Sequence, residues 1–182
     1  QKVVILPSNE QVTLKKGRDF KCGGRVFAGN LEFIGKDYYF SYDSFTLGLN
    51  QVDSTRISVD DMESSKDRYG NRTQKKIKNV VEGIRGTLKI DAPNNKSGIL
   101  AEDYPEYPIL TSEIDSYVYY DNKEIQGGVY DKDKFYYQIE PFVIDSLDNF
   151  TAGTMKFEGT LISNIFPDID EPLLRSEEHT SE

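Results

Sequence analysis

The side chains best suited to chemistry in this sequence are carboxylates and aromatic rings, because the chain holds one histidine and one cysteine. The histidine is His179, so residues 1–174 contain none. A Ser-His-Asp triad, a Cys-His pair and a histidine-ligated metal each need an imidazole. The sequence therefore argues against these three kinds of site within residues 1–174. Cys22 has no second cysteine to pair with, and we expect it to be a packed small residue.

Acidic residues leave two kinds of chemistry to consider. Glycosidases use two carboxylates about 5–9.5 Å apart, and Asp43 and Glu140 are the candidates, because they occupy equivalent positions of an internal repeat beside aromatic residues. Ca²⁺ prefers oxygen ligands, which Asp131 with Asp133, or the acids of residues 168–171, could supply. Neither stretch completes an EF-hand loop. We expect no metal, no cofactor and no catalysis, and a hydrolase fragment stays an alternative.

The internal repeat also supplies candidates for ligand binding. The stretch "KDYYFSYDSFTL" at 36–47 returns as "DKFYYQIEPFVI" at 133–144. Alternating aromatic side chains on a strand offer rings and phenol oxygens to sugar rings or acyl chains, and the alternative is that they form the core of the sheet. The candidate binding residues are Tyr38, Phe40, Tyr42, Phe135 and Tyr137.

Period-two alternation predicts the elements that carry these residues. In "FAGNLEFIG" we expect Phe27, Leu31 and Phe33 on one face and Glu32 on the other, toward water. "GTLKID" at 86–91 and "GTMKFEGTLIS" at 153–163 alternate in the same manner.

In "YYFSYDSFTLGL", Tyr38 and Phe40 are expected on one face, with Phe45, Leu47 and Leu49 on the opposite face. No window shows a sustained three-four spacing. The sequence thus predicts an all-β fold with little helix, in which antiparallel strands form a curled sheet or a sandwich.

Composition limits the partners. The net charge of −9 disfavours a nucleic-acid backbone or an anionic membrane surface as the main partner. No apolar run reaches the roughly 20 residues of a membrane-spanning helix. We therefore expect no nucleic-acid binding and no membrane span.

The internal repeat predicts that the chain is organised as two related sets of strands. Residues 1–22 are leading strands of a truncated front, residues 23–100 the first β repeat and residues 101–174 the second. The charged stretch 60–79 is expected to be a polar insertion in the first repeat. The element "G-x-Φ-charged-F-x-G" occurs once in each repeat, at 29–35 and at 153–159, and we expect its glycines to form bends or bulges.

The last eight residues, "RSEEHTSE" at 175–182, resemble a sequencing-library adapter translated in frame. We therefore expect this tail to be artefactual and the segment to belong to a longer protein. Its partner would then be the rest of its own chain.

The phrases "YPILTSEIDSYVYYD" and "FVIDSLDNFTAGTMKFEGTLIS" resemble long envelope proteins of Bacteroidota-type bacteria. More distantly, the repeated strand pattern is similar to AsmA/TamB-like proteins, whose curled sheets carry lipid in an apolar trough. These resemblances imply a location in the cell envelope or periplasm. We expect a non-catalytic β scaffold or binding segment of a larger envelope protein. The alternatives are a lipid-carrying groove, which the second resemblance implies, and a carbohydrate-binding sandwich or glycoside hydrolase fragment.

Overall fold

The computed structural model describes residues 3–60, 74–76, 81–123, 126–149, 156–164 and 173–176. Every strand pair in these ranges is antiparallel. The strands are β1 (Val3–Pro7), β2 (Thr13–Leu14), β3 (Phe20–Ala28), β4 (Leu31–Ser41), β5 (Thr46–Asp60), β6 (Gln74–Lys76), β7 (Val81–Glu82), β8 (Gly86–Lys89), β9 (Ile109–Ser112), β10 (Ser116–Tyr119), β11 (Phe135–Ile139), β12 (Phe142–Ile144), β13 (Lys156–Ser163) and β14 (Leu173–Ser176).

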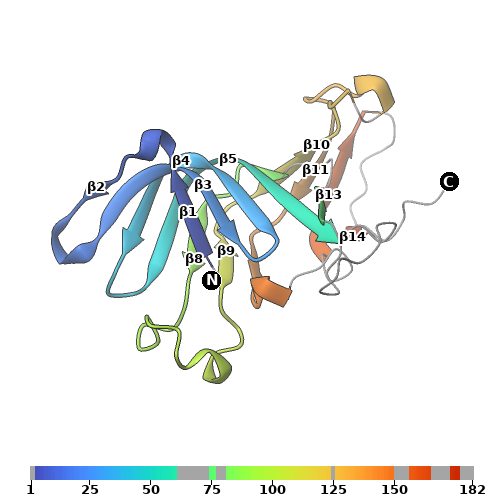
Figure 1. Ribbon diagram of the computed structural model, residues 1–182. Coiled ribbons are helices and arrows are strands. Elements are labelled where there is room, and N and C mark those ends of the chain that lie inside the picture. Colours follow the sequence, from blue (N-terminus) through green and yellow to red (C-terminus); the bar gives the residue numbers. More distant parts are fainter. Residues whose placement is uncertain are drawn as a thin grey trace.

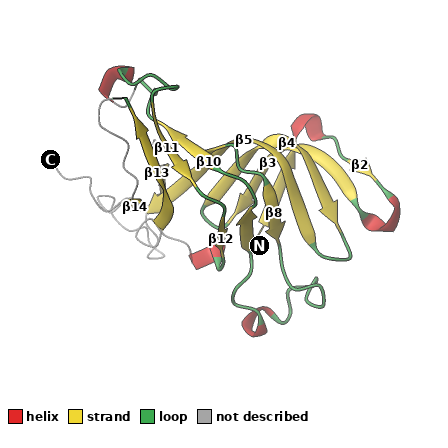
Figure 2. Ribbon diagram, turned by 180° about the vertical axis from the view of Figure 1, so that it is seen from behind, coloured by secondary structure: helices red, strands yellow, loops and turns green. Residues whose placement is uncertain are grey.

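The prediction of an all-β fold is confirmed. Helical structure in the described ranges is limited to three-residue 3₁₀ turns: η1 (Ser8–Glu10), η2 (Lys16–Arg18), η3 (Ala101–Asp103), η4 (Gln126–Gly128) and η5 (Leu147–Asn149). None of the described helices is long and apolar enough to cross a membrane. Figure 2 shows the resulting molecule as strands joined by loops and these short turns.

One long strand organises the sheet. The 15-residue β5 pairs on one side with β4 along most of its length. On its other side, Thr46–Leu49 pair with β8 and Thr55 pairs with Val81 of β7. Two series of strands therefore leave β5 on that side: β8, β9 and β12, and then β7, β10, β11, β13 and β14 (Figure 1).

The sheet is interrupted along a single line, which we call the crease. It runs through the register shifts at Gly23 and Gly35, and then through the breaks between strands at residues 83–85, 113–115 and 140–141. Each of the pairs β7–β8, β9–β10 and β11–β12 thus behaves as one strand broken at the crease. Of the glycines expected at bends or bulges, Gly29 lies in a turn and Gly35 at a register shift, whereas Gly159 lies in regular pairing with Ile139 and Gly153 lies outside the described residues.

The crease divides the sheet into two halves. Half A contains β2, β8, β9 and β12 with the adjoining ends of β3, β4 and β5. Half B contains the other ends of β3, β4 and β5 and all remaining strands of the sheet. A row of apolar side chains crosses half A: Phe20, Phe40, Leu47, Leu88, Leu110 and Ile144. A second row crosses half B: Val26, Phe33, Thr55, Val81, Val118, Tyr137 and Leu161.

Both rows belong to one hydrophobic core. The two halves also touch through their last strands, where the ring centroids of Phe142 in β12 and Phe157 in β13 lie 4.9 Å apart. Burying a side chain such as Phe33 or Leu47 stabilises the fold by about 1.5–3 kcal/mol. Cys22 is a buried free cysteine in this core, as expected.

Because of two hairpin turns, several residues lie on faces of the sheet other than those predicted. Residues 29–30 form a turn, so Phe27 lies directly opposite Glu32 and on the opposite face from Leu31 and Phe33. The prediction for Phe27 is therefore wrong, because alternation was followed through a reversal of the chain. Glu32 does face away from Phe33, but it is buried and accepts a hydrogen bond from Nε of Arg25 at 2.6 Å.

The same error affects the aromatic segment. Residues 42–45 form a turn that joins β4 to β5. Leu47 lies opposite Phe40 and Leu49 opposite Tyr38, so all four share a face. The expectation that Leu47 and Leu49 lie on the second face is wrong for the same physical reason.

Three parts of the predicted organisation can be compared with the observed strands. In the expected insertion at 60–79, residues 74–76 form β6, paired with the end of β5, and residues 61–73 and 77–79 lie outside the described residues. The segment 36–47 forms a hairpin, whereas 133–144 forms β11 and β12, which pair with other strands. Strand β14 extends across the expected boundary at residue 174.

Replacing Gly86 by alanine should destabilise the fold. A methyl group there would overlap the carbonyl oxygen of Thr111 in the paired strand β9. Overpacking of this kind costs about 1–3 kcal/mol. Gly48→Ala is the matched control, because its Cβ would meet nothing nearer than 3.6 Å. Urea unfolding of both variants checks the prediction, which is contradicted if the two lose equal stability.

The loop between β8 and β9 depends on a buried asparagine. Asn95 donates from Nδ2 to Oδ1 of Asp91 at 3.0 Å, and its Oδ1 accepts from the amide of Leu100 at 2.8 Å. Asn95→Ala should cost about 1–3 kcal/mol, because it leaves buried polar groups without partners. Asn94→Ala, which removes one exposed hydrogen bond to Tyr104, should cost less in the same thermal unfolding experiment. Equal losses would mean that the Asn95 contacts do not hold the loop.

Candidate functional site

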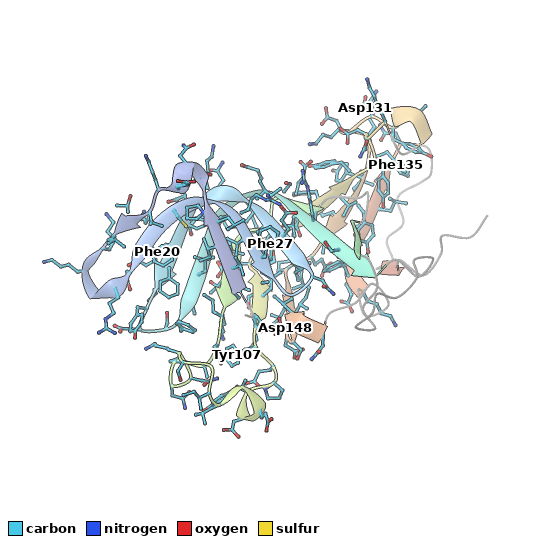
Figure 3. The ribbon with its side chains drawn as sticks, viewed as in Figure 1. Phe20, Phe27, Tyr107, Asp131, Phe135 and Asp148 are labelled. Atoms are coloured by element: carbon cyan, nitrogen blue, oxygen red, sulfur yellow. The ribbon has the colours of Figure 1, made fainter. Side chains whose placement is uncertain are left out.

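The five candidate binding residues lie in different surroundings. Tyr38, Phe40 and Tyr137 are buried, whereas Tyr42 and Phe135 are partly exposed. Figure 3 shows Phe135 at one end of the molecule and Phe20, which stacks on Phe40 at 4.7 Å, at the other. The structure therefore does not gather the five residues into one surface.

The buried members of this set have structural contacts. The hydroxyl of Tyr137 donates to the carbonyl oxygen of Phe157 at 3.0 Å, which ties β11 to β13. Burial raises the pKa of Tyr38 far above its ordinary value, and its hydroxyl has no hydrogen-bond partner among the described residues. These contacts agree with the alternative that the alternating aromatic residues form the core of the sheet.

The acidic candidates are exposed and lie on separate elements. Asp43 is in the β4–β5 turn, and Glu140 is at the crease between β11 and β12. Asp131 accepts the amide of Asp133 at 3.0 Å, and this hydrogen bond, with help from Lys134, lowers the pKa of its carboxyl. Among the residues that the structure describes, no three His, Cys, Asp or Glu side chains are grouped as metal ligands. Residues 168–170 lie outside that description, and so does Glu171.

A different group of aromatic residues forms a surface on half B. Tyr117 and Tyr119 of β10 have nearly parallel rings with centroids 6.0 Å apart. Tyr136 of β11 packs against both, at 5.9 Å from each. All three side chains are partly exposed. We call these three residues the tyrosine patch.

Strand alternation places the tyrosine patch on the face of the sheet opposite the core. Val118 lies between Tyr117 and Tyr119 and is buried, and Tyr137 follows Tyr136 and is buried. Tyr119 and Tyr136 are directly paired across β10 and β11. Because paired residues point to the same face, the three rings must gather on the outer side once β10 and β11 are in this register.

Polar groups surround the tyrosine patch. Lys132 lies over the ring of Tyr119, with Nζ 4.1 Å from the centroid, and donates to Oε2 of Glu82 at 2.8 Å. The amide of Gln138 donates to Asp115 at 2.6 Å. The hydrogen bond to Glu82 raises the pKa of Lys132, and burial raises the pKa of Tyr119, so both keep their protons at neutral pH.

This arrangement suits a ligand that has both apolar faces and hydroxyl groups. Ring surfaces contribute apolar contact, and phenols, amides and carboxylates supply donors and acceptors around them.

The sequence analysis did not single out these residues. The signal was present in "SYVYYD" at 116–121, where tyrosines alternate with a valine. The pattern shows that Tyr117 and Tyr119 share a face, but not which face the core covers. Tyr136 belongs to the repeat segment 133–144 and lies on the outer face with the other two rings.

A comparison with protein-family models, with curated proteins and with solved structures returned no significant match to this chain. The function proposed for the chain therefore rests on its own residues and geometry.

The Lys132–Glu82 pair should give a pH-dependent contribution to stability. Since the folded pKa of Lys132 is raised, its contribution is fully present below the ordinary lysine pKa of about 10.4 and is lost as pH rises through the folded value. Both side chains are more than a third exposed, so Lys132→Gln should cost only about 0.2–1 kcal/mol at neutral pH.

Chemical unfolding of the wild type and of Lys132→Gln across this alkaline range measures the difference. It should shrink as the pH rises. A difference that does not change with pH would show that the ammonium charge contributes nothing.

Proposed function

We propose that this chain is a non-catalytic β module that binds carbohydrate through the tyrosine patch, as a segment of a larger bacterial envelope protein. The observation that carries the proposal is the group of three mutually packed tyrosine rings on the outer face of half B, bordered by hydrogen-bonding side chains. The location is proposed from the sequence phrases "YPILTSEIDSYVYYD" and "FVIDSLDNFTAGTMKFEGTLIS".

Carbohydrate is favoured over other ligands by the chemistry of this surface. The C–H faces of a pyranose ring pack against aromatic rings, and its hydroxyl groups need the donors and acceptors that Glu82, Gln138 and Asp115 offer. A purely apolar ligand would take water away from the remaining donors and acceptors of these groups and offer no hydrogen bond in exchange.

The lipid-groove alternative requires an open apolar face on the repeated strands. The residues expected to line such a groove are Phe27, Leu31, Phe33, Met155, Phe157 and Leu161. Leu31, Phe33 and Phe157 are buried in the protein core, Phe27 and Leu161 are partly exposed, and Met155 lies outside the described residues. The burial of the first three weighs in favour of the sandwich-like binding module. The hydrolase alternative requires converging carboxylates, and the separate positions of Asp43 and Glu140 offer it no support.

Removing a ring from the patch should abolish most of the binding. A glycan array covering neutral, amino and acidic polysaccharides would first identify a ligand, and affinity electrophoresis in that polysaccharide would follow. Truncation of a central aromatic residue costs about 2 kcal/mol or more of binding energy, so Tyr119→Ala should weaken binding about thirtyfold. Tyr104→Ala is the matched control, because this partly exposed tyrosine contacts Tyr107 rather than the patch.

Tyr119→Phe separates the two contributions of the side chain. It keeps the ring and removes the hydroxyl, so it should retain more binding than Tyr119→Ala. The proposal fails if no polysaccharide binds, or if Tyr104→Ala and Tyr119→Ala weaken binding equally.

A further inference from the structure

Basic residues gather at the end of the molecule that lies farthest from the tyrosine patch, although the chain carries a net charge of −9. Lys15, Lys16 and Arg18 belong to the turn between β2 and β3, and all three are exposed. Figure 1 shows β2 at the outer left edge of the molecule, and Figure 3 places Phe20 at the same end and Phe135 at the other.

A fourth cation joins them from a distant part of the sequence. Lys96, from the loop between β8 and β9, lies with Nζ 4.6 Å from the ring centroid of Tyr42. Arg18 lies 4.9 Å from the same centroid and donates to the Tyr42 hydroxyl at 2.9 Å. The ring of Tyr42 therefore holds two cations from separate loops at one place. We call Lys15, Lys16, Arg18 and Lys96 the basic rim.

The charges of the basic rim are not neutralised by ion pairs. None of its four residues makes a salt bridge with a described residue. The neighbouring Lys21, in contrast, lies 3.6 Å from Asp37.

Two acids lie nearby. Asp19 accepts the hydroxyl of Tyr39 at 2.6 Å and the amide of Tyr42 at 2.8 Å, hydrogen bonds that lower the pKa of its carboxyl. Asp43 is exposed in the β4–β5 turn. The four cations of the basic rim outnumber these two acids.

Large apolar side chains border the basic rim. Leu14 of β2 is 76% exposed and Val12, two residues before it, is 47% exposed. Leu14 is followed directly by Lys15 and Lys16, so apolar and basic groups are adjacent in the chain with no acid between them. Water is a poor environment for a leucine exposed to this degree on a projecting turn, and a lipid interface is a better one.

We propose that this end of the protein docks on an anionic lipid surface, with Leu14 and Val12 entering the interface and the basic rim contacting the headgroups. Clustered basic residues are attracted to anionic lipids, and exposed apolar side chains add affinity by leaving water. The net charge of the whole chain disfavours such a partner, but attraction falls off within a Debye length, so the local charge of the docked end decides. In this orientation the tyrosine patch, at the other end, faces away from the membrane.

Vesicle co-sedimentation tests the proposal. The wild-type protein should sediment with phosphatidylcholine vesicles that contain phosphatidylglycerol, and not with phosphatidylcholine alone, and added salt should release it. Leu14→Ser and the double variant Lys15→Gln/Lys16→Gln should each reduce binding about tenfold or more. Thermal unfolding confirms that these exposed substitutions leave the fold intact.

Two matched controls keep the outcome specific. Val129→Ser removes another exposed apolar side chain and Lys21→Gln an ion-paired lysine, and neither should change vesicle binding. The proposal is overturned if the wild type does not sediment with anionic vesicles, or if the control variants and the rim variants bind these vesicles equally well.

An acidic polysaccharide is the other partner that a basic rim could attract, and dextran sulfate as a probe distinguishes it. Lipid docking predicts that Leu14→Ser loses vesicle binding selectively. If the wild type binds dextran sulfate but not vesicles, and Leu14→Ser leaves that binding unchanged, the rim is a polysaccharide site and the lipid proposal is wrong.

Discussion

The rest of the structure depends on β5 holding two series of strands at once. Its first residues pair with β8, and Thr55 pairs with β7. Between these contacts, Gly35 marks the register shift against β4, and a side chain there would overlap the carbonyl oxygen of Gln51. The backbones approach this closely only because Gly35 has no Cβ, and the close approach lets the sheet bend between its two halves.

The bend has an energetic consequence, because a flat sheet of this length would leave one whole face of apolar rows in water. Bending brings the row containing Leu47 and Leu88 and the row containing Phe33 and Val118 into one core. The hydrophobic gain from that burial stabilises a chain that has no disulfide and no long helix in its described part.

The same bend separates two outer surfaces of different chemistry. Half B presents Tyr117, Tyr119 and Tyr136 on its solvent side, where the Lys132–Glu82 ion pair and the hydrogen-bonded pair Gln138–Asp115 surround them. The far end of half A presents cations that make no salt bridge with any described residue, beside exposed Leu14. A module that holds a membrane at one end and a glycan at the other would connect the two, which is consistent with the proposed location in an envelope.

The sequence by itself determined the secondary structure and the exclusions. Period-two alternation in "GTLKID" and "GTMKFEGTLIS" was sufficient to predict strands, since alternation is a local property of the chain. The scarcity of helix followed from the same pattern, and the absence of histidine from residues 1–174 excluded imidazole chemistry there without any fold.

Only the tertiary structure decided which face of each strand is buried. The turns at residues 29–30 and 42–45 reverse the chain, so Phe27 and Leu47 lie on faces that alternation alone assigned wrongly. A strand pattern with apolar residues on both faces does not specify which one the core will cover, because that depends on strands distant in sequence. For this reason Tyr38 and Tyr137 became core residues, while Tyr117, Tyr119 and Tyr136 became a surface.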